Sequence, residues 1–365
     1  MIKLMIVPTG GLRREGITSS QLEYMKKIDK TQFQITVIAA HNNAPDVIKE
    51  FQDIGCAVLE LPDRRKHMRG YCSALKAELK KGYDIIHVHG NSAIMVLELT
   101  IAKRENVKVR IVHSRNTMCD HSGIDKLLRP FFYRRYTYAM ACGRDAGEWL
   151  FPGRPYEVFH NGKDFTRFRF DIEERKEQRK RLGLEGKVVY GHVGNINRQK
   201  NHTFLLKVFK EILQRQGNAV LYIMGDGILM DEVKQQTKDM DIADFVIFAG
   251  RVSDVDKRLL AMDTMIFPSL FEGLPNVVLE WQAEGLPSLI STTITNECTV
   301  TDLVDYLDLA DVPLKWAEKA ISLKLSDDER ERKSKSAIQA LTENGFEIDE
   351  STRKLERRYR ELLKK

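Results

Sequence analysis

The sequence predicts an α/β protein of two domains, each built on a parallel sheet that helices cover on both faces. A chain of 365 residues is longer than one ordinary hydrophobic core requires. Short apolar runs alternate with longer amphipathic stretches, and the alternation starts afresh after about residue 172. We therefore expect two Rossmann-like domains at 1–168 and 169–348 that face each other across a cleft. A last helix at 349–365 is expected to pack back on the first domain.

In the first domain, the apolar runs are short and nearly continuous, and helical patterns such as 20–28 and 73–80 separate them. Runs of this kind are typical of parallel strands that are buried on both faces. The expected strands are residues 2–7, 33–38, 57–59, 85–88, 107–112, 138–142 and 156–159.

The second domain repeats this architecture without repeating the sequence. It opens with a charged helical stretch at 172–181, after which apolar runs and helical patterns alternate again. The expected strands are residues 188–193, 219–224, 246–249, 265–267 and 288–290.

Composition excludes several classes of protein. The 42% hydrophobic and 8% aromatic content is typical of a folded globular chain, and no apolar run is long enough to cross a bilayer. Residues 1–7 are too short for a signal-peptide core and are expected to form the first strand. The five cysteines are odd in number and lack C-x-x-C spacing, which argues against a disulfide framework and a zinc site. We expect a cytoplasmic protein, with a location at the inner face of the cell membrane left open.

The positive charge is concentrated in the first domain. Residues 1–165 contain 26 Lys or Arg against 18 Asp or Glu, whereas the remainder contains 32 against 34. Basic residues next to large apolar ones can contact an anionic bilayer or a lipid phosphate, although a solvated basic helix face is the commoner explanation. Nucleic acid is not an expected partner, since no binding motif accompanies the charge. The clusters are Arg64, Arg65, Lys66 and Arg69, and Lys126, Arg129, Arg134 and Arg135 with Leu127, Leu128, Phe131, Phe132 and Tyr133.

The segment 266–287 is predicted to be a strand, a glycine-containing loop and a helix whose first residue is Pro275. The N–H groups of such a loop and helix start suit a phosphate. The carboxylates Glu272 and Glu280 would repel a phosphate, so we expect them to hold neutral hydroxyls beside it. Phosphates flanked by sugar hydroxyls indicate a nucleotide sugar. The alternative is that Glu272 caps the helix and Glu280 lies on its solvated face.

Loops after the strands of the first domain contain further candidates, because ligands of parallel sheets bind at the carboxyl ends of the strands. The glycine loop that ends at Gly16 lets the backbone approach a phosphate, but it lacks the G-x-G-x-x-G dinucleotide spacing. His113 follows the fifth strand and is a candidate active-site residue. His87 and His89 are more simply explained as structural histidines.

The loop between 191 and 202 carries two cations, Arg198 and Lys200, before a helix from about residue 203. A departing diphosphate gains negative charge, and these cations are candidates to stabilise it without a metal. The acidic pairs Asp239 with Asp241 and Asp254 with Asp256 are expected to be surface carboxylates, so no metal and no other cofactor is predicted.

Two glycine turns in the second domain can border a nucleotide base, although both can equally be plain turns. Gly225 and Asp226 follow the second strand of this domain, and Arg251 follows the next.

These residues together resemble the retaining glycosyltransferases of family 4, which have the GT-B fold. The resemblance rests on the Glu272 to Glu280 spacing with its flanking residues, on 191–201, on Gly225 to 227, on 160–162 and on the loop near Gly16. The segments 271–287 and 301–303 are similar to those of bacterial exopolysaccharide and capsule transferases.

The resemblance implies roles for individual residues. Glu272 would contact hydroxyls of the donor sugar, Glu280 the ribose hydroxyls, Lys200 the diphosphate, the Gly16 backbone the distal phosphate, and His113 the reacting centre. The donor-site candidates are Gly16, Asn195, Arg198, Lys200, Gly225, Asp226, Arg251, Gly273, Leu274, Pro275, Asn276 and Glu280.

The sequence departs from the family pattern at two places. Asn195 stands where an arginine is usual, so the diphosphate loses a cation unless Arg198 turns inward, and Glu15 stands where a glycine is expected. The implied reaction is metal-independent transfer, with retention, from a nucleoside-diphosphate sugar to a saccharide or polyprenyl-linked saccharide. The alternatives are a sugar-nucleotide epimerase or hydrolase and a degenerate, non-catalytic partner subunit. An oxidoreductase is disfavoured by the glycine spacing.

Overall fold

The computed structural model describes residues 1–119 and 121–364, and the chain forms two compact units. The first unit comprises Met1–Asp164 and Gly345–Lys365, and the second comprises Phe165–Asn344. The units therefore divide shortly before residues 168 and 348, where the sequence analysis placed its boundaries.

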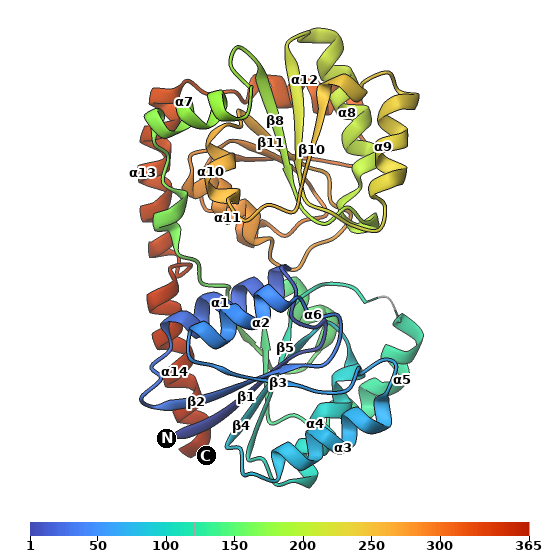
Figure 1. Ribbon diagram of the computed structural model, residues 1–365, viewed down its shortest axis with the longest axis vertical. Coiled ribbons are helices and arrows are strands. Elements are labelled where there is room, and N and C mark those ends of the chain that lie inside the picture. The colour runs from blue at the N-terminus through green and yellow to red at the C-terminus, as the bar shows by residue number, and fades with distance from the viewer. Residues whose placement is uncertain (120, 365) are drawn as a thin grey trace. The chain divides into compact units, whose positions relative to one another are not determined.

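Within the described residues, the first unit is a seven-stranded parallel sheet in the order β3-β2-β1-β4-β5-β6-β7 (Figure 1). Each expected strand is present within a few residues of its predicted position. The elements are β1 (Ile2–Pro8), α1 (Gly16–Lys27), β2 (Phe33–Ala39), α2 (Pro45–Asp53), β3 (Ala57–Glu60), α3 (Met68–Leu79), β4 (Ile85–Gly90), η1 (Ala93–Met95), α4 (Val96–Arg104), β5 (Val109–Ser114), α5 (Ser122–Phe132), β6 (Tyr138–Ala141), α6 (Arg144–Leu150), β7 (Glu157–Val158) and α14 (Ile348–Lys364).

Apolar side chains cover both faces of this sheet. Successive residues of β1 alternate between two core clusters, because neighbouring side chains of a strand point to opposite faces. Leu4 and Ile6 belong to one cluster, and Met5 and Val7 belong to the other. This two-sided burial explains why the strands are nearly continuous apolar runs.

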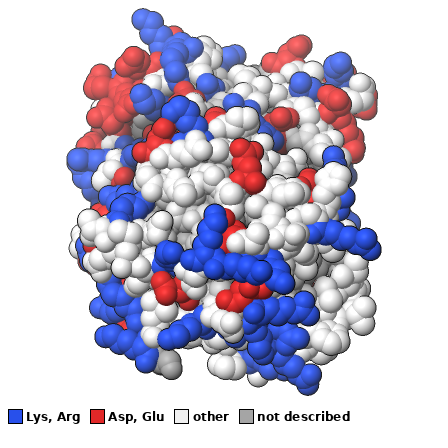
Figure 2. Space-filling model, turned by 60° about the horizontal axis from the view of Figure 1, so that its bottom comes forward, with Lys and Arg blue, Asp and Glu red and all other residues white. Residues whose placement is uncertain are grey.

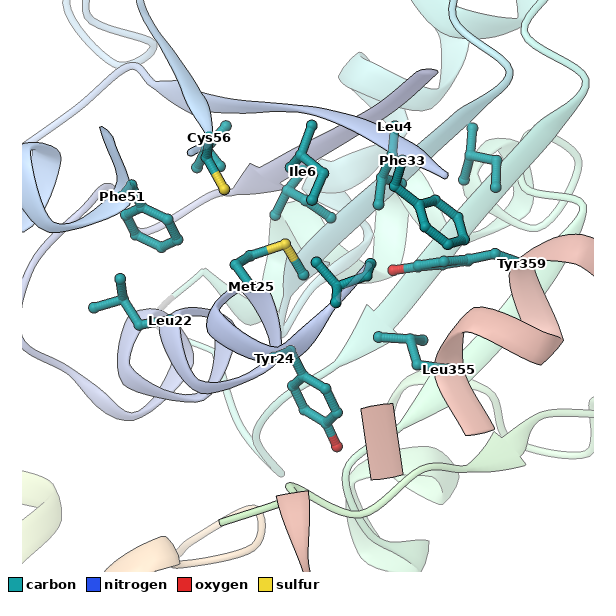
Figure 3. Packing of buried hydrophobic residues seen from close by; sticks show 14 of the residues in the cluster. Leu4, Ile6, Leu22, Tyr24, Met25, Phe33, Phe51, Cys56, Leu355 and Tyr359 are labelled. Atoms are coloured by element: carbon teal, nitrogen blue, oxygen red, sulfur yellow. The ribbon is translucent and has the colours of Figure 1, made fainter. Parts of the chain in front are cut away.

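The terminal helix α14 packs on the first unit. It begins at Ile348, one residue before the predicted start at 349, and Leu355 and Tyr359 bury their side chains in the cluster that contains β1, β2 and α1. Figure 3 shows Tyr359 extending from α14 beneath Phe33, and the two rings have centroids 5.9 Å apart. The C-terminal helix thus contributes to the core of the first unit, which also contains the N-terminal strand β1.

In the second unit, described residues form a six-stranded parallel sheet in the order β10-β9-β8-β11-β12-β13. Two parallel-sheet domains were expected, and this fold class is confirmed. The elements are η2 (Phe165–Phe168), α7 (Ile172–Arg181), β8 (Val188–Val193), η3 (Arg198–Lys200), α8 (His202–Arg215), β9 (Ala219–Met224), α9 (Met230–Asp239), η4 (Ala243–Phe245), β10 (Val246–Gly250), α10 (Val255–Leu260), β11 (Thr264–Phe267), α11 (Asn276–Ala283), β12 (Ser288–Ser291), η5 (Asn296–Cys298), β13 (Val304–Leu307), α12 (Pro313–Ser322) and α13 (Asp327–Glu343).

The sequence analysis missed β13, the strand that ends this sheet's order. It has four residues, of which Asp305, Tyr306 and Leu307 are only partly buried, so it lacks the continuous apolar pattern of the central strands. Its composition does not predict a strand, but β13 pairs in parallel with β12, and these backbone hydrogen bonds hold it in the sheet.

A buried ion pair fixes the start of β11. Asp263 accepts a hydrogen bond from the backbone N–H of Val189 at 2.7 Å and pairs with Arg175 at 2.6 Å and Arg179 at 3.2 Å. Burial alone would raise the pKa of Asp263, but the two guanidinium charges outweigh it and lower that pKa. Asp263 therefore ties β8 and α7 to the strand that leads into the candidate site.

Among residues 1–119 and 121–364, no helix is both long enough and apolar enough to span a bilayer.

Candidate active site

Lys200 and Glu272 meet at the carboxyl end of the second unit's sheet. Lys200 ends the short helix η3 after β8, where the Asn197 side chain accepts a hydrogen bond from its backbone N–H at 3.2 Å. Its Nζ lies 2.7 Å from Oε1 of Glu272, in the loop after β11. The side chains are only 14% and 9% exposed, so the pair is shielded from solvent.

Gly194 makes room for this lysine. A Cβ at residue 194 would lie 2.7 Å from Cε of Lys200 and 3.1 Å from its Cδ, closer than real contacts allow. The Lys200 ammonium also lies 4.3 Å from the ring centroid of Phe267, the last residue of β11. The face of an aromatic ring attracts a cation at this distance. The loop glycine and the aromatic ring therefore hold the lysine stem in one place.

The β11–α11 loop brings both predicted carboxylates to the site in buried form. The N–H of Leu270 donates to the carbonyl of Gln199 at 2.8 Å, which joins this loop to the Lys200 loop. Glu272 and Glu280 are each only 8% exposed. The alternative that Glu280 lies on a solvated helix face is therefore wrong.

The start of α11 corrects one detail of the prediction. Pro275 is the N-cap residue rather than the first helical residue. The first turn of a helix has N–H groups without intrahelical partners, and these carry partial positive charge. The candidates Gly273 and Leu274 precede this turn and, unlike Pro275, carry backbone N–H groups, directly after Glu272 in the chain.

The loops after β9 and β10 adjoin the Lys200 loop. Gly225 has a φ of +148°, and a Cβ there would lie 1.9 Å from the carbonyl oxygen of Gly194, so this close approach requires glycine. The Gly225 N–H donates to the carbonyl of Gly250 at 2.8 Å. Asp226 and Arg251 form an ion pair 3.7 Å apart, and both side chains are about half exposed. The structure therefore groups these three predicted residues at one edge of the sheet.

The remaining predicted cation and the acidic pairs lie outside this buried group. Asn195 is half-buried, and Arg198 is exposed and has not turned inward. Asp254 pairs with Arg258 and Arg181, and Asp256 pairs with Arg167. Burial alone would raise the pKa of Asp254, but the contacts with these arginines outweigh burial and lower that pKa to about 2. Asp239 and Asp241 are exposed.

The first unit contains a cluster of three buried histidines that the sequence analysis treated as separate residues. His87 and His89 lie on one face of β4, and His89 is paired in register with His113 of β5. One ring nitrogen of each histidine lies within 4.8 Å of a ring nitrogen of the other two. Among residues 1–119 and 121–364, this is the one group of three side chains placed closely enough to hold a metal ion. His113 lies within β5, not after it as predicted. The i, i+2 spacing of His87 and His89, with a further histidine near the end of the next apolar run, was the available signal.

Hydrogen bonds occupy both ring nitrogens of His87 and the Nδ1 atoms of His89 and His113, whereas the Nε2 atoms of His89 and His113 have no partner within the described chain. His87 Nε2 lies 3.2 Å from His113 Nδ1, and Arg115 donates to His89 Nδ1 at 3.1 Å from Nε and 3.0 Å from Nη2. Burial lowers the pKa of all three histidines well below the ordinary value, and the charge of Arg115 lowers it further. Neutral rings beside a guanidinium suit a polar, uncharged ligand group better than a cation.

Gly16 begins α1, directly after the loop that follows β1. A Cβ built at Gly16 would meet no atom within 4 Å, so the backbone there has open space beside it. The first N–H groups of α1 lack intrahelical partners, and such groups are the donors that a phosphate site uses.

Comparison with known proteins gives a family match in the second unit. Residues 187–324 match the family model described as glycosyl transferases group 1. This segment contains Lys200, Glu272 and Glu280, together with the loops that follow β8, β9, β10 and β11.

Two relatives cover most of the chain. A protein named EpsF from Bacillus subtilis (strain 168) is 28% identical over 323 residues, which are 84% of this chain and 84% of EpsF. The Escherichia coli UDP-Gal:alpha-D-GlcNAc-diphosphoundecaprenol alpha-1,3-galactosyltransferase is 26% identical over 321 residues, which are 81% of this chain and 82% of that enzyme.

The fold also has solved counterparts. Anabaena Alr3699/HepE, solved in complex with UDP and glucose and in complex with UDP-glucose, superimposes with a TM-score of 0.83 at 13% identity. The match covers 99% of this chain and 100% of HepE. At this level of identity the likeness shows the shared GT-B fold.

Proposed function

We propose that this chain, which is a glycosyltransferase with a group 1 domain at residues 187–324, moves a sugar from a UDP-sugar to a lipid-linked saccharide during the synthesis of an exopolysaccharide or capsule. Transfer proceeds with retention of configuration and without a metal ion. The observation that carries the proposal is the shielded Lys200–Glu272 pair, 2.7 Å long, beside the start of α11. It combines a fixed cation and backbone donors for phosphate with a carboxylate for sugar hydroxyls.

The candidate residues bind different parts of the donor and acceptor. Lys200, the backbone N–H groups of Gly273 and Leu274 and the start of α11 bind the diphosphate. Glu272 accepts hydrogen bonds from hydroxyls of the donor sugar, and Glu280 accepts them from the ribose. Gly16 provides a backbone donor for the distal phosphate, and His113 contacts the reacting centre.

The reaction needs no side-chain nucleophile. The bond between the sugar's anomeric carbon and the diphosphate oxygen breaks, and the acceptor's oxygen forms the new bond on the same face. The proton of the acceptor hydroxyl passes to the departing diphosphate oxygen. Lys200 and the α11 N–H groups offset the negative charge that develops on this leaving group, which is the stabilisation that a divalent metal supplies in other sites.

The comparisons support the choice of donor and acceptor. HepE was solved with UDP and with UDP-glucose, and the Escherichia coli relative is named for UDP-galactose and for an acceptor linked to diphosphoundecaprenol. The group 1 transferase domain favours sugar transfer over epimerisation and over a non-catalytic partner role.

An exposed apolar surface on the first unit suits a lipid-linked acceptor. Helix α5 exposes Ile124 (53%), Leu127 (72%) and Phe131 (55%), with Lys126 and Arg134 exposed beside them. Figure 2 shows Lys and Arg gathered over the lower part of the view. Apolar side chains among basic ones match the interface of an anionic membrane, and we assign α5 as the contact that brings the enzyme to its acceptor.

Two of the predicted basic residues do not belong to this surface. Arg64 contacts the buried Glu98 at 2.6 Å, and Arg129 contacts the buried Asp125 at 2.7 Å. Both are structural ion pairs, which leaves fewer cations for the membrane than the sequence indicated.

A transfer assay tests the function. Purified protein is incubated with UDP-, GDP- and ADP-sugars and a polyprenyl-diphosphate-linked saccharide, with and without a chelator, and the glycolipid product is analysed by NMR. We expect product from a UDP-sugar in the presence of chelator, with the anomeric configuration of the donor retained. Free sugar or an epimer formed from donor alone would contradict the proposal, as would inverted product.

A further inference from the structure

A buried chain of hydrogen bonds leads from the C-terminal helix to His113. The Tyr359 hydroxyl of α14 lies 2.7 Å from His87 Nδ1, and His87 Nε2 lies 3.2 Å from His113 Nδ1. The three side chains are between 0% and 2% exposed. The two imidazole rings are nearly parallel, at 9°, with centroids 5.3 Å apart. All of these groups belong to the first unit.

Burial fixes the direction of the first hydrogen bond. Within the described residues, His87 is the hydrogen-bond partner of the Tyr359 hydroxyl, and the fully buried ring has no access to water. A buried O–H that merely accepted a bond would leave its own proton unpaired, which is unfavourable away from water. The phenol is also not ionised, since burial raises the pKa of Tyr359 well above its ordinary value. Tyr359 therefore donates to His87 Nδ1.

This direction propagates through both rings. A neutral imidazole has one N–H and one lone pair, so His87 accepts at Nδ1 and carries its proton on Nε2. His87 Nε2 then donates to His113 Nδ1, and His113 must carry its proton on Nε2. That nitrogen is buried and has no hydrogen-bond partner within the described part of the chain. His113 therefore presents an unused N–H donor.

We propose that Tyr359, acting through His87, is a positioning residue that holds His113 in its Nε2–H tautomer, so that His113 donates a hydrogen bond to the bound sugar substrate. The inference rests on the proposed function for the placement of His113 at the reacting centre. His113 cannot act as a general base in this tautomer, because its remaining lone pair is occupied by His87. This agrees with a mechanism in which the departing diphosphate accepts the proton.

The neighbouring His89 is held in the same tautomer, but by a different hydrogen-bond donor. Arg115 can only donate, so His89 Nδ1 must accept and His89 Nε2 must carry the proton. His89 Nε2 is likewise buried without a hydrogen-bond partner in the described chain. The fold thus uses two separate donors, a phenol and a guanidinium, to set the tautomers of two adjacent histidines in the same sense.

NMR of the full-length protein labelled with ¹⁵N-histidine tests the assignment without any substrate. Two-bond ¹⁵N–¹H spectra distinguish a protonated ring nitrogen from one with a lone pair, and the His113 signals are assigned by their loss in His113→Asn. We expect wild-type His113 to be neutral with its proton on Nε2. In Tyr359→Phe, the His113 signals should shift toward a mixture of tautomers. Tyr71→Phe is the matched control, since it removes a buried hydroxyl that contacts Glu98 in the same unit.

Activity then tests the consequence of the tautomer. Tyr359→Phe should lower kcat by about tenfold while KM for the donor changes little, because less of the enzyme presents the N–H donor. A wild-type His113 protonated on Nδ1, or His113 signals unchanged in Tyr359→Phe, would overturn the proposal. The wild-type spectrum shows which nitrogen of His113 is protonated even if Tyr359→Phe does not fold. Expected tautomers in a protein that transfers no sugar would support the tautomer assignment while refuting the proposed function.

Discussion

The two units place polar side chains at the ends of similar parallel strands, yet the chemistry of the two groups differs. In the second unit, Lys200 and Glu272 form a charged pair 2.7 Å long. In the first unit, His87, His89 and His113 are neutral because burial lowers their pKa values, and Arg115 donates hydrogen bonds to His89. Under the proposed function, this difference corresponds to a division of labour, in which one unit binds anionic phosphate and the other offers uncharged donors to hydroxyls.

The largest expected effect comes from removing the cation of the second unit. Lys200→Ala should lower kcat/KM by about 10²–10³-fold, because the leaving diphosphate loses a preorganised positive charge. Lys207→Ala is the matched control, since Lys207 is an exposed lysine on the adjoining helix α8. Steady-state kinetics with the UDP-sugar provide the measurement. Unaltered turnover in Lys200→Ala would remove the phosphate role.

A smaller effect should follow from moving this lysine rather than removing it. The new methyl group in Gly194→Ala would collide with the Lys200 stem, which is flexible enough to shift. We expect kcat/KM to fall about 10–100-fold, as misplaced catalytic groups do, with little change in the melting temperature. Gly217→Ala, where a Cβ meets open space, is the control. Equal activity of the two variants would show that the position of Lys200 is not critical.

Membrane contact should distinguish the two units in a vesicle-binding assay. Leu127→Ser should weaken binding of the full-length protein to vesicles containing anionic lipid by about tenfold, because one exposed leucine no longer enters the interface. Val312→Ser in the second unit, where Val312 is 62% exposed, should have no effect. Binding should also weaken with salt, since Lys126 and Arg134 contribute through charge. Equal binding of both variants would contradict the assignment of α5.

The neutral histidines predict a modest pH dependence of stability. Their folded pKa values lie below the unfolded value, so below about pH 6.5 the unfolded chain binds more protons than the native one. The free energy of unfolding should therefore fall as the pH decreases from 7.5 to 5.5, by at most about 1.4 kcal/mol per pH unit for each such histidine. In urea titrations, His89→Gln should flatten this slope, whereas His67→Gln, at an exposed site, should not.

The second unit contributes to the same pH dependence through His202. Burial, and to a smaller extent the charge of the nearby Lys200, lower the pKa of His202 to about 4. His202→Phe should therefore flatten the slope as well. A slope independent of both His89 and His202 would show that other groups control acid unfolding.

Local patterns predicted most of the fold and the charged half of the site. Continuous apolar runs identified the central strands, and loops such as Gly194 to Lys200 lie close to their strands in sequence. The short strand β13 escaped notice because partly buried residues dominate it. The histidine chain could not be foreseen, since it depends on the register of β4 against β5 and on Tyr359, which lies 272 residues from His87. Contacts of that separation are set by tertiary packing and not by any local pattern.

The central claim, that the Lys200–Glu272 pair marks a metal-free diphosphate site, is tested most directly by calorimetric titration of UDP, GDP and ADP. We predict that one diphosphate, UDP, binds wild-type protein with the same affinity with and without chelator. Its affinity should fall in Lys200→Ala and stay unchanged in Lys207→Ala. Binding that chelator abolishes, or that survives intact in Lys200→Ala, would contradict the account.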